Sequence, residues 1–407
     1  MTTVDPYARL GVRRRINAAG ALTRLGGAVM APEVVAAMAA ASRASVDIGE
    51  LQDAASGRIA AATGAEAGLV TTGAAAALTL ATAAAMARFD VARMAALPHA
   101  DGFPRDVLIP RTHRTGYARA LAAAGARLVD IGHNDRGTGA GVRGLEAWEI
   151  EAALSPSVAA FGFSANPTTI VDLPTVVATC RPRGVPVIVD AAAQLPPKEN
   201  LRRYIAMGAD LVVFSGGKAL GGPQASGILA GRRDLVASAL LQQLDMDVSP
   251  QTWTPPRLVD GANLRGVPHH GIGRGFKAGK EEIVGLLTAL ERFVEADGDR
   301  NNAALVARLD AMATSIADCR GVSVTLVPAH ATGRVPVLEL LIDAGTTGID
   351  ALGLSARLQA DDPPVHLSER HATRGVLTID PQVLQPESDT LLVAAIRRAL
   401  QGGAAVR

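Results

Sequence analysis

Short apolar runs alternate with helical segments over the first two thirds of the chain, and this pattern constrains the fold more than any other feature. The runs at 106–110, 158–164, 185–190 and 209–215 are almost continuously apolar. A strand that is apolar on both faces is typical of a parallel sheet covered by helices on both sides. The sequence therefore predicts an α/β domain built on a mostly parallel sheet.

The length of the chain predicts more than one domain. A single hydrophobic core stops growing at about 250–300 residues, and the chain has 407 residues. From about residue 283 a long amphipathic helix begins, and the pattern after it changes to short separated strands. We expect an N-terminal segment at 1–50 that lines the active site, a large domain at 51–285 and a small C-terminal α+β domain at 286–407.

Composition disfavours several classes of protein. The formal net charge is +1, which provides no overall field for nucleic acid or an anionic membrane. The two cysteines, Cys180 and Cys319, have neither metal-ligand nor disulfide spacing. The N-terminus lacks an apolar signal segment, and the most apolar stretch, 74–87, is shorter than the roughly 20 residues of a membrane span. We expect a cytoplasmic protein without metal, nucleic-acid or membrane partners.

One lysine lies in a glycine-rich segment, which could be either a nucleotide-binding loop or the site of a lysine with a covalent role. The segment ADLVVFSGGKALGGPQASG (209–227) places Lys218 among five glycines. A nucleotide-binding P-loop requires G-x-x-x-x-G-K-[ST], whereas here Ala219 follows the lysine. The segment GIGRGFKAGK (271–280) resembles a dinucleotide fingerprint but does not open a strand–turn–helix of a βαβ unit. Both nucleotide interpretations are therefore disfavoured.

Covalent chemistry explains the same lysine together with two other signals. Pyridoxal 5'-phosphate needs a lysine for its aldehyde, a carboxylate for its pyridine nitrogen and donors for its phosphate. Lys218 follows one strand, Asp190 ends another, and Gly73–Ala74 begins a helix whose N-terminus can bind phosphate. Singly, these residues are explained as a solvated lysine, a helix-capping aspartate and helix packing. Their combination predicts pyridoxal 5'-phosphate.

Five stretches carry a resemblance to a known family. They are INAAGALTRLGG, ELQDAASGRIAAATGAEAGLVTTGAAA, GVPVIVDAAAQLPPKENL, GADLVVFSGGKALGGPQASGILAGRRDL and GIGRGFKAGKEEIVGLLTALE, and they span about residues 15 to 290. In them the chain resembles fold type I pyridoxal-phosphate enzymes of the group related to L-seryl-tRNA(Sec) selenium transferase. It is closest in type to proteins like D-glucosaminate-6-phosphate ammonia-lyase. The resemblance implies a large cofactor-binding domain, a small C-terminal domain, and a homodimer or higher homo-oligomer with shared active sites.

The resemblance also implies roles for residues of a cofactor site. Lys218 would form the Schiff base and later move the Cα proton, while Asp190 would pair with the pyridine nitrogen. The remaining expected contacts are Ala192 and His113 on the ring faces, Asn166 at the phenolic oxygen, Gly73, Ala74 and Ser215 at the phosphate, and Gln194. Alternatives remain open for three of them: a surface histidine, an Asn-Pro turn, and a glutamine displaced by one residue from its place in cysteine desulfurases.

Substrate-binding residues are expected from three other segments. Arg24, next to Thr23, lies in the N-terminal segment, and His270, Arg274 and Lys277 lie in the loop PHHGIGRGFKAGK. Simple packing at the start of a helix explains that loop equally well. An arginine of the C-terminal domain would bind the substrate carboxylate, for which Arg370 fits best by position and Arg374 is the rival.

The implied activity is that of a lyase acting on an amino acid. We expect α,β-elimination of a β-hydroxy or sugar amino acid to a 2-oxo acid and ammonia. An aldolase, a racemase or an epimerase would use the same parts. A selenium-transferase-like role is disfavoured because the chain lacks the large basic surface that tRNA requires. A non-catalytic relative is disfavoured because mere binding of the cofactor does not require Lys218.

Overall fold

The computed structural model describes residues 5–134, 144–261 and 264–401, and the chain forms two compact units. Residues 30–295 form the larger unit, and residues 1–29 together with 296–407 form the smaller one. This division differs from the boundaries expected above. Strand β1 (Ile16–Ala18) pairs with β11 (Val365–His371), and helix α11 (Lys280–Glu295) packs on α2 (Pro32–Ala41). The N-terminal residues are therefore part of the smaller unit, and α11 is part of the larger one.

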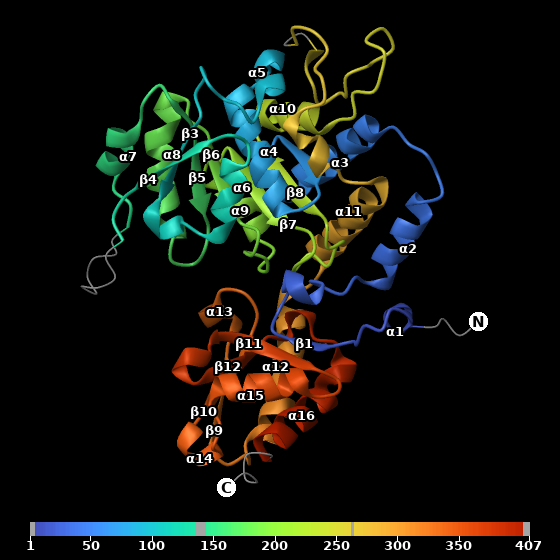
Figure 1. Cartoon of the computed structure of the whole chain (residues 1–407), viewed down its shortest axis with the longest axis vertical. Helices are drawn as coiled ribbons and strands as arrows, with labels where there is room; N and C mark the ends of the chain where they lie inside the picture. Colours follow the sequence, from blue (N-terminus) through green and yellow to red (C-terminus); the bar gives the residue numbers. More distant parts are fainter. Residues whose placement is uncertain (1–4, 135–143, 262–263, 402–407) are drawn as a thin grey trace. The chain divides into compact units, whose positions relative to one another are not determined.

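A seven-stranded sheet forms the centre of the larger unit (Figure 1). Its strands are β2 (Ala67–Thr71), β3 (Asp106–Pro110), β4 (Arg127–Ile131), β5 (Val158–Ser164), β6 (Val187–Asp190), β7 (Leu211–Ser215) and β8 (Gly227–Gly231). They are arranged in the order β2-β8-β7-β6-β5-β3-β4. Only β8 runs against its two neighbours, so the expected mostly parallel sheet is confirmed.

Helices cover both faces of this sheet. They are α3 (Ile48–Thr63), α4 (Ala74–Ala87), α5 (Val91–Ala96), α6 (Arg119–Ala122), α7 (Ala147–Ala153), α8 (Leu173–Cys180), α9 (Asn200–Ala206), α10 (Arg233–Gln243), and α2 and α11. Side chains of α4 and α10 pack against one face, and those of α3, α8, α9 and α11 pack against the other. Both faces of the strands therefore need apolar residues, which explains their continuous apolar runs.

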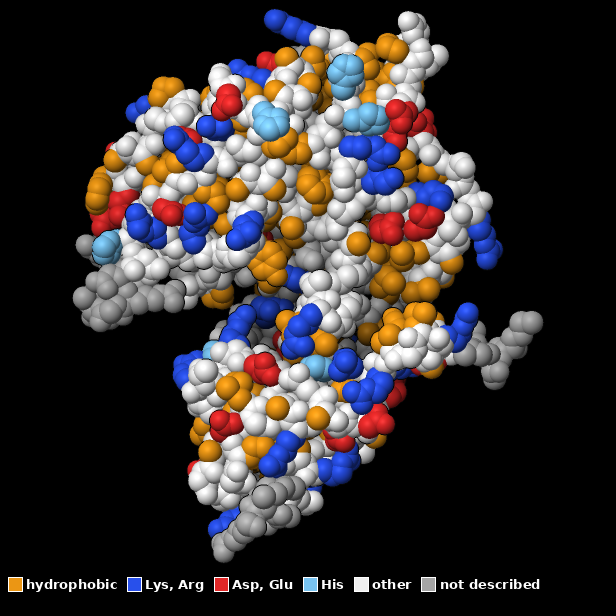
Figure 2. Space-filling view, in the orientation of Figure 1, with side chains coloured by type: hydrophobic (Ala, Val, Ile, Leu, Met, Phe, Trp, Pro, Cys, Tyr) orange, Lys and Arg blue, Asp and Glu red, His pale blue; other side chains and the backbone are white. Residues whose placement is uncertain are grey.

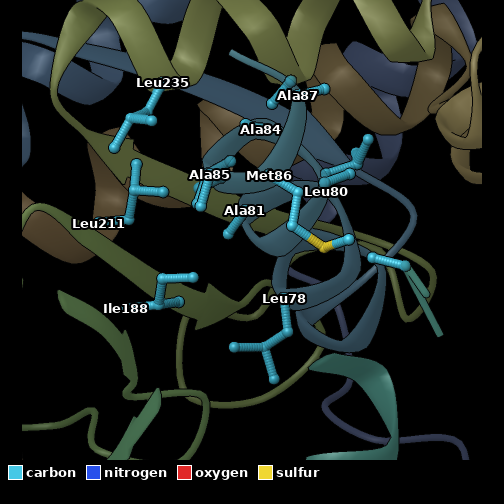
Figure 3. Close-up of a cluster of buried hydrophobic side chains, with 14 of the residues drawn as sticks. Leu78, Leu80, Ala81, Ala84, Ala85, Met86, Ala87, Ile188, Leu211 and Leu235 are labelled. Carbon is cyan, nitrogen blue, oxygen red and sulfur yellow. The ribbon is translucent and has the colours of Figure 1, made fainter. Parts of the chain in front are cut away.

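Strand alternation divides the apolar residues between two cores. Ile188 contributes to the core on the α4 side, whereas Val187 and Val189 contribute to the opposite core. Figure 3 shows Leu78 of α4 in one cluster with Ile188 of β6 and Leu211 of β7. Helix α4 is buried along almost its whole length, as expected for this alanine-rich stretch. In the described part of the chain, no helix is both long and apolar enough to cross a membrane.

The smaller unit is an α+β structure, as expected. Its strands are β1, β9 (Val322–Val327), β10 (Val337–Ile342), β11 and β12 (Val376–Ile379), in the order β1-β11-β12-β10-β9. Its main helices are α12 (Gly298–Ile316), α15 (Ala351–Ala360) and α16 (Asp389–Gln401); short helices α1 (Pro6–Arg9), α13 (Ala329–Thr332) and α14 (Ala344–Thr347) complete it. Strand β11 was not expected, because its second half, SERH, is polar.

A buried carboxylate ties together three segments at the amino-terminal ends of the parallel strands. Asp106 begins β3 and is 4% exposed. It accepts two hydrogen bonds from the guanidinium of Arg127, at 2.7 and 2.6 Å, and one from the hydroxyl of Ser157 at 2.6 Å. The bonds from Arg127 hold the pKa of Asp106 below its usual range, against the effect of burial.

We therefore expect Asp106→Asn to lower the free energy of unfolding by about 2 kcal/mol at neutral pH, the size typical of hydrogen bonds to a charged group. Because the folded-state pKa is lowered, this stabilisation is complete above the unfolded pKa of about 4 and is lost as the pH falls through the folded pKa. Denaturant unfolding of both forms between acid and neutral pH tests this. The matched control is Asp101→Asn, which removes an exposed pair with Arg105; an equal loss in both variants would contradict the prediction.

Candidate functional site

The carboxyl ends of six strands, all except β8, lie at one edge of the large sheet. Because β8 runs against both β2 and β7, these two strands run the same way as β6, β5 and β3. The residues Thr71, Gly227 and Ser215 are paired across β2, β8 and β7, and Ser164 pairs with Asp190 across β5 and β6. The predicted cofactor residues that follow these strands therefore belong to one edge of the sheet.

Lys218 lies three residues beyond the end of β7, in a tightly packed turn. Its carbonyl accepts a hydrogen bond from the N–H of Gly221 at 3.0 Å. A Cβ on Gly217 would lie 2.7 Å from the Cα of Gln224, so a side chain at this position would displace backbone. The glycines therefore permit a close return of the chain, and the half-buried Lys218 is held on a compact turn.

Asp190, at the end of β6, carries the carboxylate of the site. Its Oδ1 accepts a hydrogen bond from the N–H of Ala192 at 3.1 Å. Burial raises the pKa of Asp190, and the N–H of Ala192 and the charge of Lys218 oppose this shift. A half-buried carboxylate at a strand end is well suited to a positively charged group of a ligand, because such a group favours its ionised form.

The turn between β2 and α4 exposes backbone donors. Gly73 is the N-cap of α4 with φ of +147°, a conformation that favours glycine. No side chain caps the helix, so its first-turn N–H groups and its dipole are available to an anion. A Cβ on Gly227 would lie 2.7 Å from the N of Ala74. The absence of that side chain allows β8 to approach the turn.

His113 follows β3 and is 2% exposed. Its Nδ1 accepts a hydrogen bond from the N–H of Ser164 at 3.3 Å, and its ring meets that of Phe163 edge-on, with centroids 4.6 Å apart. The proton of the neutral ring is therefore on Nε2, which is buried without a hydrogen-bond partner in the described structure. Burial lowers the pKa of His113 to about 4. His113 and Asp190 line the same small cavity.

The structure places the other expected cofactor residues near these strand ends. The Oδ1 of Asn166 accepts hydrogen bonds from the N–H groups of Thr168 and Thr169, which is the turn-forming role weighed above. Its side-chain NH₂ group has no protein partner among the described residues, so the turn leaves that donor available. Ala192 and Gln194 lie on the segment after β6, and the carbonyl of Gln194 accepts a bond from Asn200 at 2.7 Å.

The loop before α11 shows ion pairs for two of its expected substrate-binding residues. His270 contacts Asp247 at 3.1 Å, and Arg274 forms a salt bridge with Asp245. Lys277 is exposed. The residues Ile272–Phe276 form a 3-10 turn that follows no strand, so the resemblance of this loop to a dinucleotide fingerprint carries no structural support.

The smaller unit contains a cationic cluster that sequence reasoning recognised only in part. Arg370 and Arg334 lie near the carboxylate of Asp380, whose pKa is raised by burial against the opposing charges of both arginines. Arg334 donates to the Oε1 of Gln382 at 2.6 Å. Its Nε and the Nε2 of Gln382 are buried donors without partners in the described structure. Arg334 was missed because nothing in its segment, ATGRVPV, distinguishes it from a surface arginine.

The two other arginines considered for substrate binding differ in their surroundings. Arg24 is exposed; burial lowers the pKa of His366, and the nearby charge of Arg24 lowers it further. Arg374 is also exposed and contacts the Nδ1 of His371 at 2.5 Å. Arg370 is exposed as well, but of these three arginines it alone lies near Asp380, in the cluster that contains the unpartnered donors.

The geometry of the larger unit fits a ligand that has three distinct chemical ends. The α4 turn suits a phosphate, Asp190 suits a protonated ring nitrogen, and Lys218 supplies an amine. The unpartnered Nε2 of His113 provides a further donor in the cavity that Asp190 lines. These are the groups that the cofactor implied by the resemblance requires.

Comparisons with known proteins identify relatives of the chain. Residues 168–247 match the model of the L-seryl-tRNA selenium transferase family (SelA). The chain is 30% identical to a 5'-C-glycyluridine monooxygenase-decarboxylase from Streptomyces sp, over 98% of this chain and 93% of the relative. It is 28% identical to a D-glucosaminate-6-phosphate ammonia lyase from Salmonella typhimurium (strain 14028s / SGSC 2262), over 99% and 100% of the two chains. A solved structure of D-glucosaminate-6-phosphate ammonia-lyase superposes with a TM-score of 0.82, 28% identity and coverage of 99% and 100%.

The buried histidine predicts a pH dependence of stability. The pKa of His113 is about 4 in the folded chain and about 6.5 in the unfolded chain. The unfolded state therefore binds the extra proton first, and His113 destabilises the fold as the pH falls from about 6.5 to 4, by on the order of 3 kcal/mol in total. Unfolding measurements across this range should show a weaker pH dependence in His113→Gln. The same substitution at the exposed His99 is the control, and identical profiles for both variants would contradict the prediction.

Proposed function

The chain belongs to the group of fold type I pyridoxal-phosphate enzymes related to L-seryl-tRNA(Sec) selenium transferase, and we propose that it is a pyridoxal 5'-phosphate-dependent lyase. Its substrate would be a β-hydroxy or sugar amino acid, which it converts to a 2-oxo acid and ammonia. The observation that carries this proposal is the full-length similarity to D-glucosaminate-6-phosphate ammonia lyase. The arrangement of Lys218, Asp190 and the α4 turn at one sheet edge supports it.

Each part of the site has a defined task in this proposal. The amine of Lys218 would hold the cofactor covalently and, when free, would take the proton from Cα of the substrate. Asp190 would keep the ring nitrogen protonated, and Gly73, Ala74 and Ser215 would hold the phosphate. When bound, the cofactor withdraws electrons from Cα.

The ring contacts are the second part of this assignment. The neutral His113 would contact one face of the ring and Ala192 the other. Asn166 would donate its NH₂ group to the phenolic oxygen, and Gln194 would complete the contacts. The hydrogen bond from Ser164 to Nδ1 supports the neutral form of His113, because it fixes the proton on Nε2.

A second candidate function is favoured by the relative with 30% identity. That relative is a monooxygenase-decarboxylase, so oxidative decarboxylation of an α-amino acid is the alternative to elimination. The two reactions differ in their products and requirements: the alternative consumes oxygen and releases carbon dioxide, whereas elimination does neither. Aldol cleavage and racemisation use the same residues and are distinguished by aldehyde formation and by loss of optical rotation.

The proposal includes a cellular location, an oligomeric state and the kind of partner the enzyme acts on. We place the enzyme in the cytoplasm, where its two free cysteines, Cys180 and Cys319, stay reduced. It acts on a small molecule as a homodimer or higher homo-oligomer, with His270 and Arg274 reaching a shared active site. Figure 2 shows acidic and basic side chains mixed on the visible face of the larger unit rather than one broad basic surface, which supports a reaction without tRNA.

The smaller unit supplies the carboxylate-binding arginine in this proposal. Arg370 is the residue expected from the sequence, and Arg334 with Gln382 adds the two unpartnered donors described above. An anion at this cluster would accept these donors and balance the excess positive charge around Asp380. Arg24 is a further substrate contact.

Two substitutions at the strand ends test the cofactor assignment. We expect Lys218→Ala to abolish the visible absorbance of the bound Schiff base and to lower turnover by at least about 100-fold, because the proton-transferring amine is lost. Asp190→Asn should keep the covalent link but lower turnover by a similar factor. A wild-type protein that shows no such absorbance with added cofactor would overturn the proposal.

A substrate screen identifies the reaction. Purified protein is tested with D- and L-β-hydroxy amino acids and sugar amino acids, and the formation of ammonia, 2-oxo acid, aldehyde and carbon dioxide and the uptake of oxygen are measured.

The cluster in the smaller unit yields a test of carboxylate binding. Arg334→Met and Arg370→Met should each raise KM by about 10- to 100-fold, the loss expected for hydrogen bonds to a charged group. Arg374→Met is the matched control, since Arg374 lies on the neighbouring turn and, unlike Arg370, is not among the charges that act on Asp380; it should leave KM within about twofold. A large effect of Arg374→Met with no effect of the other two would reassign the carboxylate site.

A further inference from the structure

The outer edge of strand β2 is completed by side chains and a loop instead of another strand. β2 is the terminal strand of the sheet, so every second N–H points away from β8. The N–H of Gly68 donates to the hydroxyl of Ser56 at 3.0 Å, and that of Val70 to the Oε1 of Gln52 at 3.1 Å. The N–H of Thr72 donates to the carbonyl of Phe276 at 3.3 Å. These bonds form a ladder that ends directly before Gly73.

Two buried glutamines join this ladder to the loop before α11. The Nε2 of Gln52 donates to the carbonyl of Val70 at 2.9 Å and to the Oε1 of Gln243 at 3.2 Å. The Nε2 of Gln243 donates to the same carbonyl of Val70 at 3.2 Å and to that of Phe276 at 3.0 Å. All four amide hydrogens are therefore used. Gln52 is 1% and Gln243 is 5% exposed, so water does not compete for these bonds.

Helix packing alone does not require this network. Leucine or methionine would fill the same volume between α3, α10 and β2 without burying amides, which are costly to bury unless every polar atom is satisfied. What the glutamines add is a connection: the carbonyl of Phe276 accepts from both Thr72 and Gln243. The loop of residues 271–276 and the anion-binding turn of residues 72–74 are thus held by the same polar groups.

We propose that Gln52 and Gln243 are positioning residues that set the turn of residues 72–74 for the phosphate of the cofactor. The proposal rests on the proposed function, in which that turn binds the phosphate. Gln243 holds the carbonyl of Phe276 where it fixes Thr72, and Gln52 holds both backbone groups of Val70. Displacement of either would move the first-turn N–H groups of α4, whose bonds to a phosphate depend on their direction. The segment ELQDAAS, which carries Gln52, thereby has a role in cofactor binding although it does not touch the cofactor.

The test compares two probes that differ only in the phosphate. Dissociation constants of pyridoxal 5'-phosphate and of pyridoxal are measured from visible absorbance for wild type, Gln243→Met and Gln52→Met. The preference for the phosphorylated probe should fall about tenfold in both variants, while the affinity for pyridoxal stays within about twofold, because only the phosphate cradle has moved. Ser56→Ala is the matched control: it removes the bond of the same ladder at Gly68, four residues before Thr72, and should leave the preference unchanged.

The outcomes separate this proposal from the proposed function. A wild-type protein without visible absorbance contradicts the proposed function. A wild-type band with an unchanged preference in both glutamine variants, whatever their melting temperatures, overturns only the positioning role.

If the variants do not fold, amide hydrogen exchange of the wild-type chain provides the test. Inorganic phosphate should slow exchange in peptides covering both 67–78 and 271–278, because coupling between the two segments is reciprocal. Slowing in the first peptide alone would overturn the proposal.

Discussion

The close approach of Gly227 to the turn of Gly73 and Ala74 is the constraint on which the candidate site depends. The turn occupies the space that a side chain at 227 would fill. Strand β8 can therefore lie between β2 and β7 and pair in register with both. This places the N-terminus of α4 beside the end of β7, from which the chain continues to Lys218. A turn with free backbone donors and an amine, 145 residues apart in sequence, therefore lie at one edge of the sheet, and the glycine at 227 leaves the space that this requires.

Burial then gives the polar groups at this edge their chemistry. Asp190 and His113 are both shifted toward their neutral forms, since a low-dielectric environment disfavours charge. For His113 this leaves a neutral ring that keeps its proton on Nε2. For Asp190 it leaves a carboxylate whose ionised form needs a nearby cation, which Lys218 supplies in part. A ligand that brings its own positive charge would complete that balance.

Much of the fold and the centre of the site could be predicted from local sequence. Continuous apolar runs identified β3, β5, β6 and β7, because a strand that is buried on both faces needs apolar residues at almost every position. Asp190 and Lys218 followed from their positions after such strands, since parallel strands end at a common edge. Strands β1 and β11 escaped prediction, because β1 is short and half of β11 is polar and exposed.

The sequence by itself determined the class of fold, the alternation of helices and strands, and which polar residues terminate the central strands. These properties depend on periodicity and on neighbours within a few residues. Only the tertiary structure decided which distant groups meet: Arg334 with Gln382, Gln52 with Gln243, and the N-terminal segment with the smaller unit. The residues in such contacts are 48 to more than 300 positions apart in sequence. Arginine and glutamine are common on protein surfaces, so their residue types alone do not indicate that they are buried or which partner they have. Their partners are fixed by how the layers pack, which no local pattern encodes.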